Sequence, residues 1–240
     1  MTKKLYIPGA NTPFELSRSK IDLFMECPKC FYLDRRIGIQ RPPGYPFSLN
    51  NAVDALLKKE FDYYREKELP HPLMQENQIN AVPYQNENLH NQTWRFNRKG
   101  VRYLDKNTNL EIFGSIDDLW IDNDTKEIMV VDYKATSKKD EVSLDADWQI
   151  SYKRQVEVYQ WLLRKNNLKI SDLSYFVYCN GIKDKERFDQ KLEFTTKIIP
   201  YKGDCSWVEN TLNSIYDILN REEIPKKTPA CSWCKYRDQE

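Results

Sequence analysis

The sequence predicts an α/β fold, with a mixed sheet flanked by helices, for most of its 240 residues. Segments with apolar residues at helical spacing alternate with short apolar runs bounded by turn residues. Hydrophobic residues make up 40% of the chain, which is enough for a packed core and too many for a disordered chain. Because no interval between residues 17 and 234 has linker composition, we expect an extended lead-in over residues 1–16 and a single domain over residues 17–240.

The N-terminal third is expected to be mainly helical. A first helix is expected to open at Ser17 or Ser19, because serine is a favourable N-cap residue. A long helix is expected from Ser48 to a point before Pro70, since apolar residues recur there at helical spacing: Val53, Leu56, Leu57, Phe61 and Tyr64. Residues 70–93 are polar and rich in Asn, and we expect a loop there or a wide connection with one short strand.

The rest of the chain alternates between strand-like and helical segments. Three strands, a helix, two strands and a helix are expected, at residues 93–104, 110–121, 128–135, 147–166, 173–180, 191–199 and 205–219. Turn residues separate the first three strands, a pattern typical of an antiparallel meander.

Composition and charge exclude little about partners. The net charge of +1 neither requires nor excludes nucleic acid, because phosphate binding depends on local patches. The longest apolar runs last about five residues, against the ~20 that a membrane span requires, so we expect no membrane association. The basic N-terminus lacks the apolar stretch of a secretory signal, which favours a cytoplasmic location.

Four of the six cysteines form two CxxC pairs near opposite ends of the sequence, Cys27 with Cys30 and Cys231 with Cys234. Thiolates at positions i and i+3 can bind one metal ion, and two such pairs supply four soft ligands suited to Zn²⁺ or an iron–sulfur cluster. Shared ligation would join the N-terminal helix to the C-terminal tail. The alternative is four reduced cysteines without a metal.

Three charged residues lie inside apolar, strand-like segments: Asp117, Asp132 and Lys134. Strand alternation places Asp132 and Lys134 on the same face. Charges in such segments are costly unless they are paired or bind a metal, and two carboxylates with a lysine form a compact site for Mg²⁺. The alternatives are a solvent-facing ion pair of Asp132 with Lys134 and the start of a turn at Asp117.

Four motifs follow one another in a fixed order. They are the S-x-(apolar)…C-P-x-x-F-Y-L pattern from Ser19 to Leu33, the G-x-I-D motif at 114–117, the V-D-Y-K-T-like motif at 131–136 and the Q-x-x-x-Y motif at 155–159. Together they resemble the PD-(D/E)XK nuclease superfamily, and more specifically its RecB-like branch, which includes the AddB nuclease domain and RecB-like CRISPR-associated exonucleases. The resemblance covers most of residues 17–237 and implies a restriction-endonuclease-like αβββαβ core.

The resemblance also implies an activity and a set of site residues. It implies a divalent-metal-dependent deoxyribonuclease that hydrolyses phosphodiester bonds, with Asp117 and Asp132 binding Mg²⁺ or Mn²⁺ and Lys134 as the catalytic lysine. Gln155 and Tyr159 would contact the substrate or brace the site. We expect an exonuclease acting on single-stranded DNA or a duplex end, in DNA repair and recombination or CRISPR-type processing, with a helicase or a CRISPR-type protein as partner.

The sequence departs from the family pattern in two places. RecB-like enzymes often place a metal-binding His in the helix before the strands, and Asp54 stands at that position here. Asp54 could bind a hard cation through oxygen. The cysteines are divided two and two, where the family usually has one N-terminal and three C-terminal cysteines. This division leaves the metal open between an iron–sulfur cluster and Zn²⁺.

Two other functions stay open at the level of sequence. The first is a catalytically weak or inactive nuclease-fold module that binds nucleic acid or a protein partner, and Asp54 in place of His favours it. The second is a zinc-stapled adaptor unrelated to nucleases, in which the strand carboxylates are surface charges.

Basic and aromatic residues near the expected site could form a track for a DNA strand, because lysine and arginine follow phosphates and aromatic rings stack on bases. The basic residues are Arg95, Arg98, Lys99, Arg102, Lys138, Lys139, Lys153 and Arg154, and the aromatic ones are Trp94, Phe96 and Trp148. Ordinary solvated charge is the alternative for each basic residue.

Overall fold

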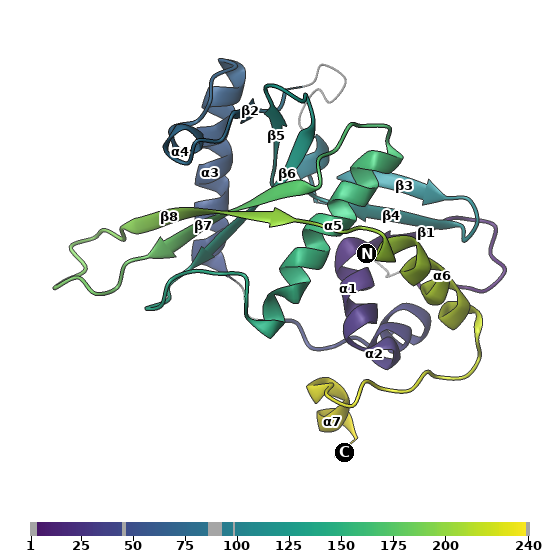
Figure 1. Ribbon diagram of the computed structural model, residues 1–240. Helices are drawn as coiled ribbons and strands as arrows, with labels where there is room; N and C mark the ends of the chain where they lie inside the picture. Colours follow the sequence, from purple (N-terminus) through teal and green to yellow (C-terminus); the bar gives the residue numbers. More distant parts are fainter. Residues whose placement is uncertain (1–3, 45–46, 86–92, 98, 239–240) are drawn as a thin grey trace. The chain divides into compact units, whose positions relative to one another are not determined.

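The computed structural model describes residues 4–44, 47–85, 93–97 and 99–238 (Figure 1). The chain divides into two compact units. The terminal unit consists of Met1–Tyr45, Arg102–Gly114 and Cys205–Glu240, and the sheet unit consists of Pro46–Val101 and Ser115–Asp204. A single domain over residues 17–240 stays a prediction.

The terminal unit combines a small sheet with helices from both ends of the sequence. Its elements are β1 (Phe14–Ser17), α1 (Arg18–Glu26), α2 (Pro28–Tyr32), the π-helical η1 (Leu33–Ile37), β3 (Val101–Asp105), β4 (Leu110–Gly114), α6 (Trp207–Asn220) and α7 (Ser232–Arg237). The sheet order is β1-β4-β3, and β1 lies parallel to β4 with Leu16 opposite Ile112. Leu16 and Ile112 are fully buried with Ile21 of α1, so they form the core of this unit. Ser17 is the N-cap residue of α1, as expected.

The sheet unit contains a five-stranded mixed sheet with the order β2-β5-β6-β7-β8. Its elements are α3 (Ser48–Glu66), α4 (Pro72–Glu76), β2 (Ala81–Pro83), η3 (Thr93–Arg95), β5 (Asp118–Asp122), β6 (Ile128–Thr136), η4 (Asp147–Gln149), α5 (Ile150–Lys165), β7 (Leu173–Gly181) and β8 (Phe194–Lys202). Strands β6 and β7 are parallel, and the other neighbouring strands are antiparallel. The long helices and the last two strands agree with the sequence prediction, although β8 begins three residues later than expected.

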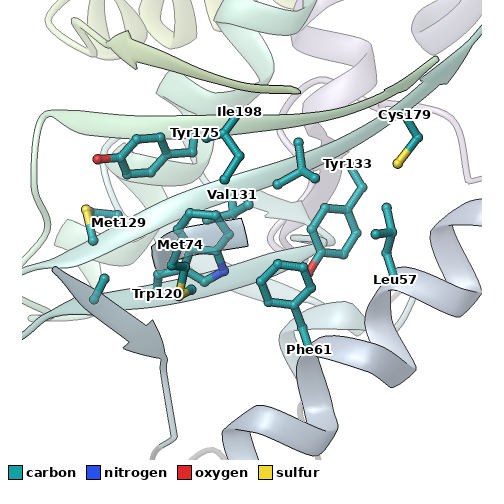
Figure 2. Close-up of a cluster of buried hydrophobic side chains, with 12 residues drawn as sticks. Leu57, Phe61, Met74, Trp120, Met129, Val131, Tyr133, Tyr175, Cys179 and Ile198 are labelled. Atoms are coloured by element: carbon teal, nitrogen blue, oxygen red, sulfur yellow. The ribbon is translucent and has the colours of Figure 1, made fainter. Parts of the chain in front are cut away.

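The core of the sheet unit lies between α3 and one face of the sheet (Figure 2). Val131 and Tyr133 are two residues apart on β6, so both point to this face, where they meet Leu57 and Phe61 of α3. The Phe61 ring is fully buried and stacks on Trp120 with centroids 5.5 Å apart. Burial of a side chain of this kind contributes about 1.5–3 kcal/mol. The alternate residues of β6 therefore have the opposite face available for polar chemistry.

The sequence predictions for the strands at residues 93–104 and 110–121 are wrong in part. The segment predicted as one strand over residues 110–121 forms β4 and β5, which belong to different sheets, so the three strands are not one antiparallel meander. The backbone N–H of Ile116 donates to the carbonyl of Trp94 instead of to a strand partner, which interrupts the ladder. Thr93–Arg95 is a 3₁₀ turn, and the first strand begins only at Val101.

The polar segment at residues 70–93 contains more structure than expected. The predicted short strand is present as β2, but helix α4 was not predicted. His71 is the N-cap residue of α4, and its Nδ1 accepts a hydrogen bond from the N–H of Leu73. Residues 86–92 of this segment lie outside the described part of the chain. Over the residues that are described, no helix has both the length and the apolar character needed to cross a bilayer.

Candidate functional site

The two predicted strand carboxylates are brought together by the pairing of β5 with β6. Asp118 lies opposite Val131 at the start of β5, so Asp117, the residue before it, lies beside the end of this pairing and next to the β6 segment that contains Asp132. The Tyr133 N–H donates to Oδ2 of Asp117 over 3.1 Å, which fixes this carboxylate against β6.

Lys134 lies in a cage of polar and aromatic groups. Its ammonium forms an ion pair with Asp132, whose side chain is only 1% exposed. The Nζ atom lies 3.5 Å from Oε1 of Gln155 and 4.2 Å from the centre of the Tyr152 ring. A carboxylate and a π face both stabilise a cation, so these contacts hold the Lys134 ammonium in one place.

The predicted pair on α5, Gln155 and Tyr159, forms one side of this cage. Gln155 donates through Nε2 to the hydroxyl of Tyr159 over 3.4 Å while its Oε1 faces Lys134. The Tyr159 ring is buried. Tyr152 is a further residue of the site, and its position three residues before Gln155 on the same helix face is the signal that could have identified it. Burial and then the charge of Asp132 raise the pKa of the Tyr152 phenol, which stays neutral.

Asp54 is joined to Asp117 by a lysine that sequence reasoning missed. The Nζ atom of Lys58 lies 2.8 Å from Oδ2 of Asp54 and 3.1 Å from Oδ1 of Asp117. Burial and the neighbouring charge of Asp117 raise the pKa of Asp54, although Lys58 opposes them. Burial alone would lower the pKa of Lys58, but the two carboxylates raise it above its ordinary value. The i, i+4 spacing on α3 was the signal that could have identified Lys58.

The oxygen donors fit a hard divalent cation in type. Asp132 comes from β6, Asp117 directly precedes β5 and Asp54 comes from α3. Carboxylate oxygens are the ligands that Mg²⁺ and Mn²⁺ prefer. In the described part of the chain, these three carboxylates do not bring one oxygen atom each within 4.8 Å of one another. Two ammonium groups, those of Lys58 and Lys134, offset part of the negative charge of these three carboxylates.

A second buried anion, Asp118, stabilises the turn that presents Asp117. Its fully buried carboxylate forms ion pairs with Arg65 and Arg95 and accepts a hydrogen bond from the Tyr133 hydroxyl over 2.5 Å. Arg95 also donates to the backbone carbonyl of Asp117 over 2.9 Å. Asp118 therefore belongs to the fold on the core face, while its neighbour Asp117 belongs to the candidate site.

This network corrects part of the predicted DNA track. The guanidinium of Arg95 forms ion pairs with Asp62 and Asp118, and Trp94 is buried. Neither side chain is therefore presented to a DNA strand. In the terminal unit, Arg102 pairs with Glu15 and Glu111.

The basic residues near α5 stay candidates for the predicted track. Lys138 lies 5.3 Å from the ring centre of the exposed Trp148, and Lys153 lies 5.9 Å from that of Tyr201. Lys99 and Lys139 are exposed, Arg154 is partly exposed, and Phe96 is exposed. Arg98 lies outside the described residues.

The four paired cysteines meet in the terminal unit, as predicted. One ligand atom from each lies within 4.8 Å of the others, and all four residues are buried. Cys27 and Cys231 are the N-cap residues of α2 and α7, so each CxxC pair turns its second sulfur back toward the first. Burial alone would raise the pKa of the Cys27 thiol, but backbone hydrogen bonds from Cys30 and Thr228 and contacts with neighbouring thiols lower it to about 7. Such a thiol readily supplies a thiolate ligand.

The fold and the carboxylate–lysine arrangement define a nuclease-type α/β protein with a separate thiolate centre. The chain matches the sequence model of the PD-(D/E)XK nuclease superfamily over residues 15–239, and it belongs to that superfamily. Members of the superfamily are generally metal-dependent nucleases. No curated protein is similar enough to the chain to be matched.

Proposed function

We propose that this protein is a divalent-metal-dependent deoxyribonuclease of the RecB-like branch. The observation that supports it best is the Asp132–Lys134 pair on β6, with Asp117 directly before the neighbouring strand and Gln155 against the lysine. The Q-x-x-x-Y pair on α5 and the cysteine centre formed by the two chain ends support the RecB-like assignment.

The proposed chemistry is hydrolysis of a phosphodiester bond. Asp117 and Asp132 would hold the cation, with Asp54 as a third oxygen donor. When bound, a divalent cation supplies charge stabilisation for the phosphate and lowers the pKa of an attacking water. Lys134 would orient that water and stabilise the negative charge that develops on the phosphate oxygens. Gln155 would keep the Lys134 ammonium in position, because its amide oxygen faces the Nζ atom.

The proposed substrate is DNA, as a single strand or a duplex end. The Lys138–Trp148 pair supports this choice, because an exposed indole beside an ammonium can stack on a base while the lysine contacts a phosphate. We propose exonuclease action in the cytoplasm, in DNA repair and recombination or CRISPR-type processing, beside a helicase or CRISPR-type partner.

A second candidate function has one observation in its favour. Lys58 bridges Asp54 and Asp117, at the position where the family often has a metal-binding His. An ammonium there supplies part of the positive charge that a cation would bring. A weak or inactive nuclease-fold module that binds nucleic acid or a protein would tolerate this arrangement.

Cleavage of end-labelled DNA tests the proposal. The wild type should cut single-stranded or duplex DNA when Mg²⁺ or Mn²⁺ is added, and Lys134→Ala should reduce the rate by about 10²–10⁴-fold. Lys59→Ala is the control, because this exposed lysine of α3 lies outside both the cage and the predicted DNA track. A folded wild-type protein that binds DNA but cuts neither substrate with either metal would favour the binding module.

A further inference from the structure

The spacing of the four cysteine sulfurs distinguishes between the two kinds of metal centre. The Sγ atoms of Cys27 and Cys234 are 3.7 Å apart, those of Cys30 and Cys231 are 3.7 Å apart, and those of Cys30 and Cys234 are 3.5 Å apart. None of the four chosen ligand atoms lies more than 4.8 Å from another. The sulfurs are therefore gathered around a single point.

A single zinc ion requires this spacing. Four thiolates at about 2.3 Å from one Zn²⁺, at the corners of a tetrahedron, stand about 3.8 Å from one another. A four-iron cluster binds each thiolate to a different iron at a different corner of a cube, which sets the sulfurs roughly 6 Å apart. The observed separations agree with the first geometry and are too short for the second.

We propose that the four-cysteine centre holds one Zn²⁺ in a closed, structural, tetrahedral site. This inference does not depend on the nuclease activity. All four ligands are protein thiolates and all are buried, so no position is left for water or substrate, which is the pattern of structural zinc sites. The centre thus differs from the carboxylate site in role as well as in ligand type.

The surroundings of the cysteines compensate the charge of such a centre. Zn²⁺ with four thiolates has a net charge of about −2, which is costly in a buried place unless cations or N–H groups lie nearby. The Nη2 atom of Arg41 lies 3.7 Å from Sγ of Cys231, and its Nη1 lies 2.5 Å from Glu26. Hydrogen bonds from the backbone at Cys30 and Thr228 reach Cys27. These outer contacts orient the ligands and stabilise the thiolate form.

The zinc would fix two segments that have little stability by themselves. Helix α2 has five residues and α7 has six, and isolated helices of this length do not persist in water. The two CxxC pairs are also separated by 200 residues of sequence, from Cys30 to Cys231. A shared ion supplies folding free energy to the terminal unit by joining these helices.

Metal analysis of the full chain tests the proposal. The protein is purified without oxygen from cells supplied with both iron and zinc, and its zinc, iron and acid-labile sulfide are measured. We expect roughly one zinc per chain and no sulfide. Cobalt added to the metal-free protein should give the visible absorption of a tetrahedral thiolate site at one equivalent. About four irons with matching sulfide per chain, or no bound metal, would overturn the proposal.

Cysteine variants locate the ion. Cys234→Ser should lose the zinc, while Cys205→Ser should retain it, because Cys205 is outside the cluster. A folded Cys234→Ser protein with wild-type zinc content and affinity would contradict the assignment. If Cys234→Ser does not fold, the cobalt spectrum of the wild type decides, since it requires no variant.

Discussion

The two candidate metal sites of this protein differ in ligand type, in burial and in the charges beside the ligands. The cysteine centre of the terminal unit has four neutral or anionic sulfurs gathered within 4.8 Å and buried from solvent. The carboxylate site of the sheet unit has its acidic groups separated by two lysines, and Asp54 and Asp117 are partly exposed. A protein cation, Arg41, contacts the cysteine centre at Cys231, while Lys58 and Lys134 pair directly with the carboxylates of the other site.

This difference indicates how each site would use an ion. Thiolates with no competing ammonium between them favour tight, permanent binding, which suits a structural role. Carboxylates that are already neutralised by lysine exchange one cation for another at modest cost. Such a site suits a hard cation that keeps open positions for water and phosphate.

The strongest way to separate the two sites is to remove a strand carboxylate. Asp132→Asn should reduce cleavage by at least about 10²-fold, because it removes an oxygen donor and the partner of Lys134. The zinc content should stay at the wild-type value, since the change lies in the other unit. DNA cleavage and metal analysis on the same sample provide the measurement. Full activity in Asp132→Asn would contradict the assigned site, and loss of zinc would show that the sites are coupled.

The adjacent aspartates Asp117 and Asp118 allow the effect of the candidate site on cleavage to be separated from the effect of the buried network on stability. Asp118→Asn should lower the free energy of unfolding by about 3–5 kcal/mol, because it removes the buried anion that Arg65 and Arg95 share and leaves them only the partly exposed Asp62. Asp117→Asn should remove cleavage while leaving most of the stability. Urea denaturation of both variants measures the difference. Equal stability of the two variants would mean that the buried network is not required for the fold.

Lys58 tests whether a protein cation competes with the metal. Lys58→Met removes the ammonium between Asp54 and Asp117 and should tighten Mn²⁺ binding roughly two- to five-fold, the range given by a partly exposed ion pair of about 0.4–1 kcal/mol. Lys59→Met, the exposed neighbour on α3, is the control and should leave the affinity unchanged. Titration followed by calorimetry gives both constants. Weaker binding in Lys58→Met would show that Lys58 supports the ion instead of competing with it.

The smallest expected effect is a pH dependence of the free energy of unfolding that arises from His71 in the sheet unit. Burial lowers the pKa of His71, although Glu60 opposes the shift, so the unfolded chain takes up a proton before the folded chain does. The free energy of unfolding should therefore fall as the pH drops below about 6.5, and this group should have no effect above that pH. His71→Asn keeps an N-cap acceptor for α4 and should flatten this part of the profile. An unchanged slope between pH 7 and pH 5 would exclude His71 as its source.

The sequence by itself determined the local features of this protein. The order of the long helices and of the last strands follows from hydrophobic spacing, and the CxxC pairs follow from residues three positions apart. Superfamily membership was also predicted, because its motifs are short and occur in a fixed order. Within β6, strand alternation alone places Asp132 beside Lys134, and the structure contains that ion pair.

Only the tertiary structure decided which residues from distant segments meet. Lys58 reaches Asp117 across 59 positions of sequence, and Arg65 reaches Asp118 across 53. The break between β4 and β5, where Ile116 bonds to Trp94, is a further example. The spacing of the four sulfurs likewise depends on helices from both chain ends. Local periodicity specifies which side of an element a residue occupies, but the partner across a long loop is selected by packing and charge compensation in the folded chain.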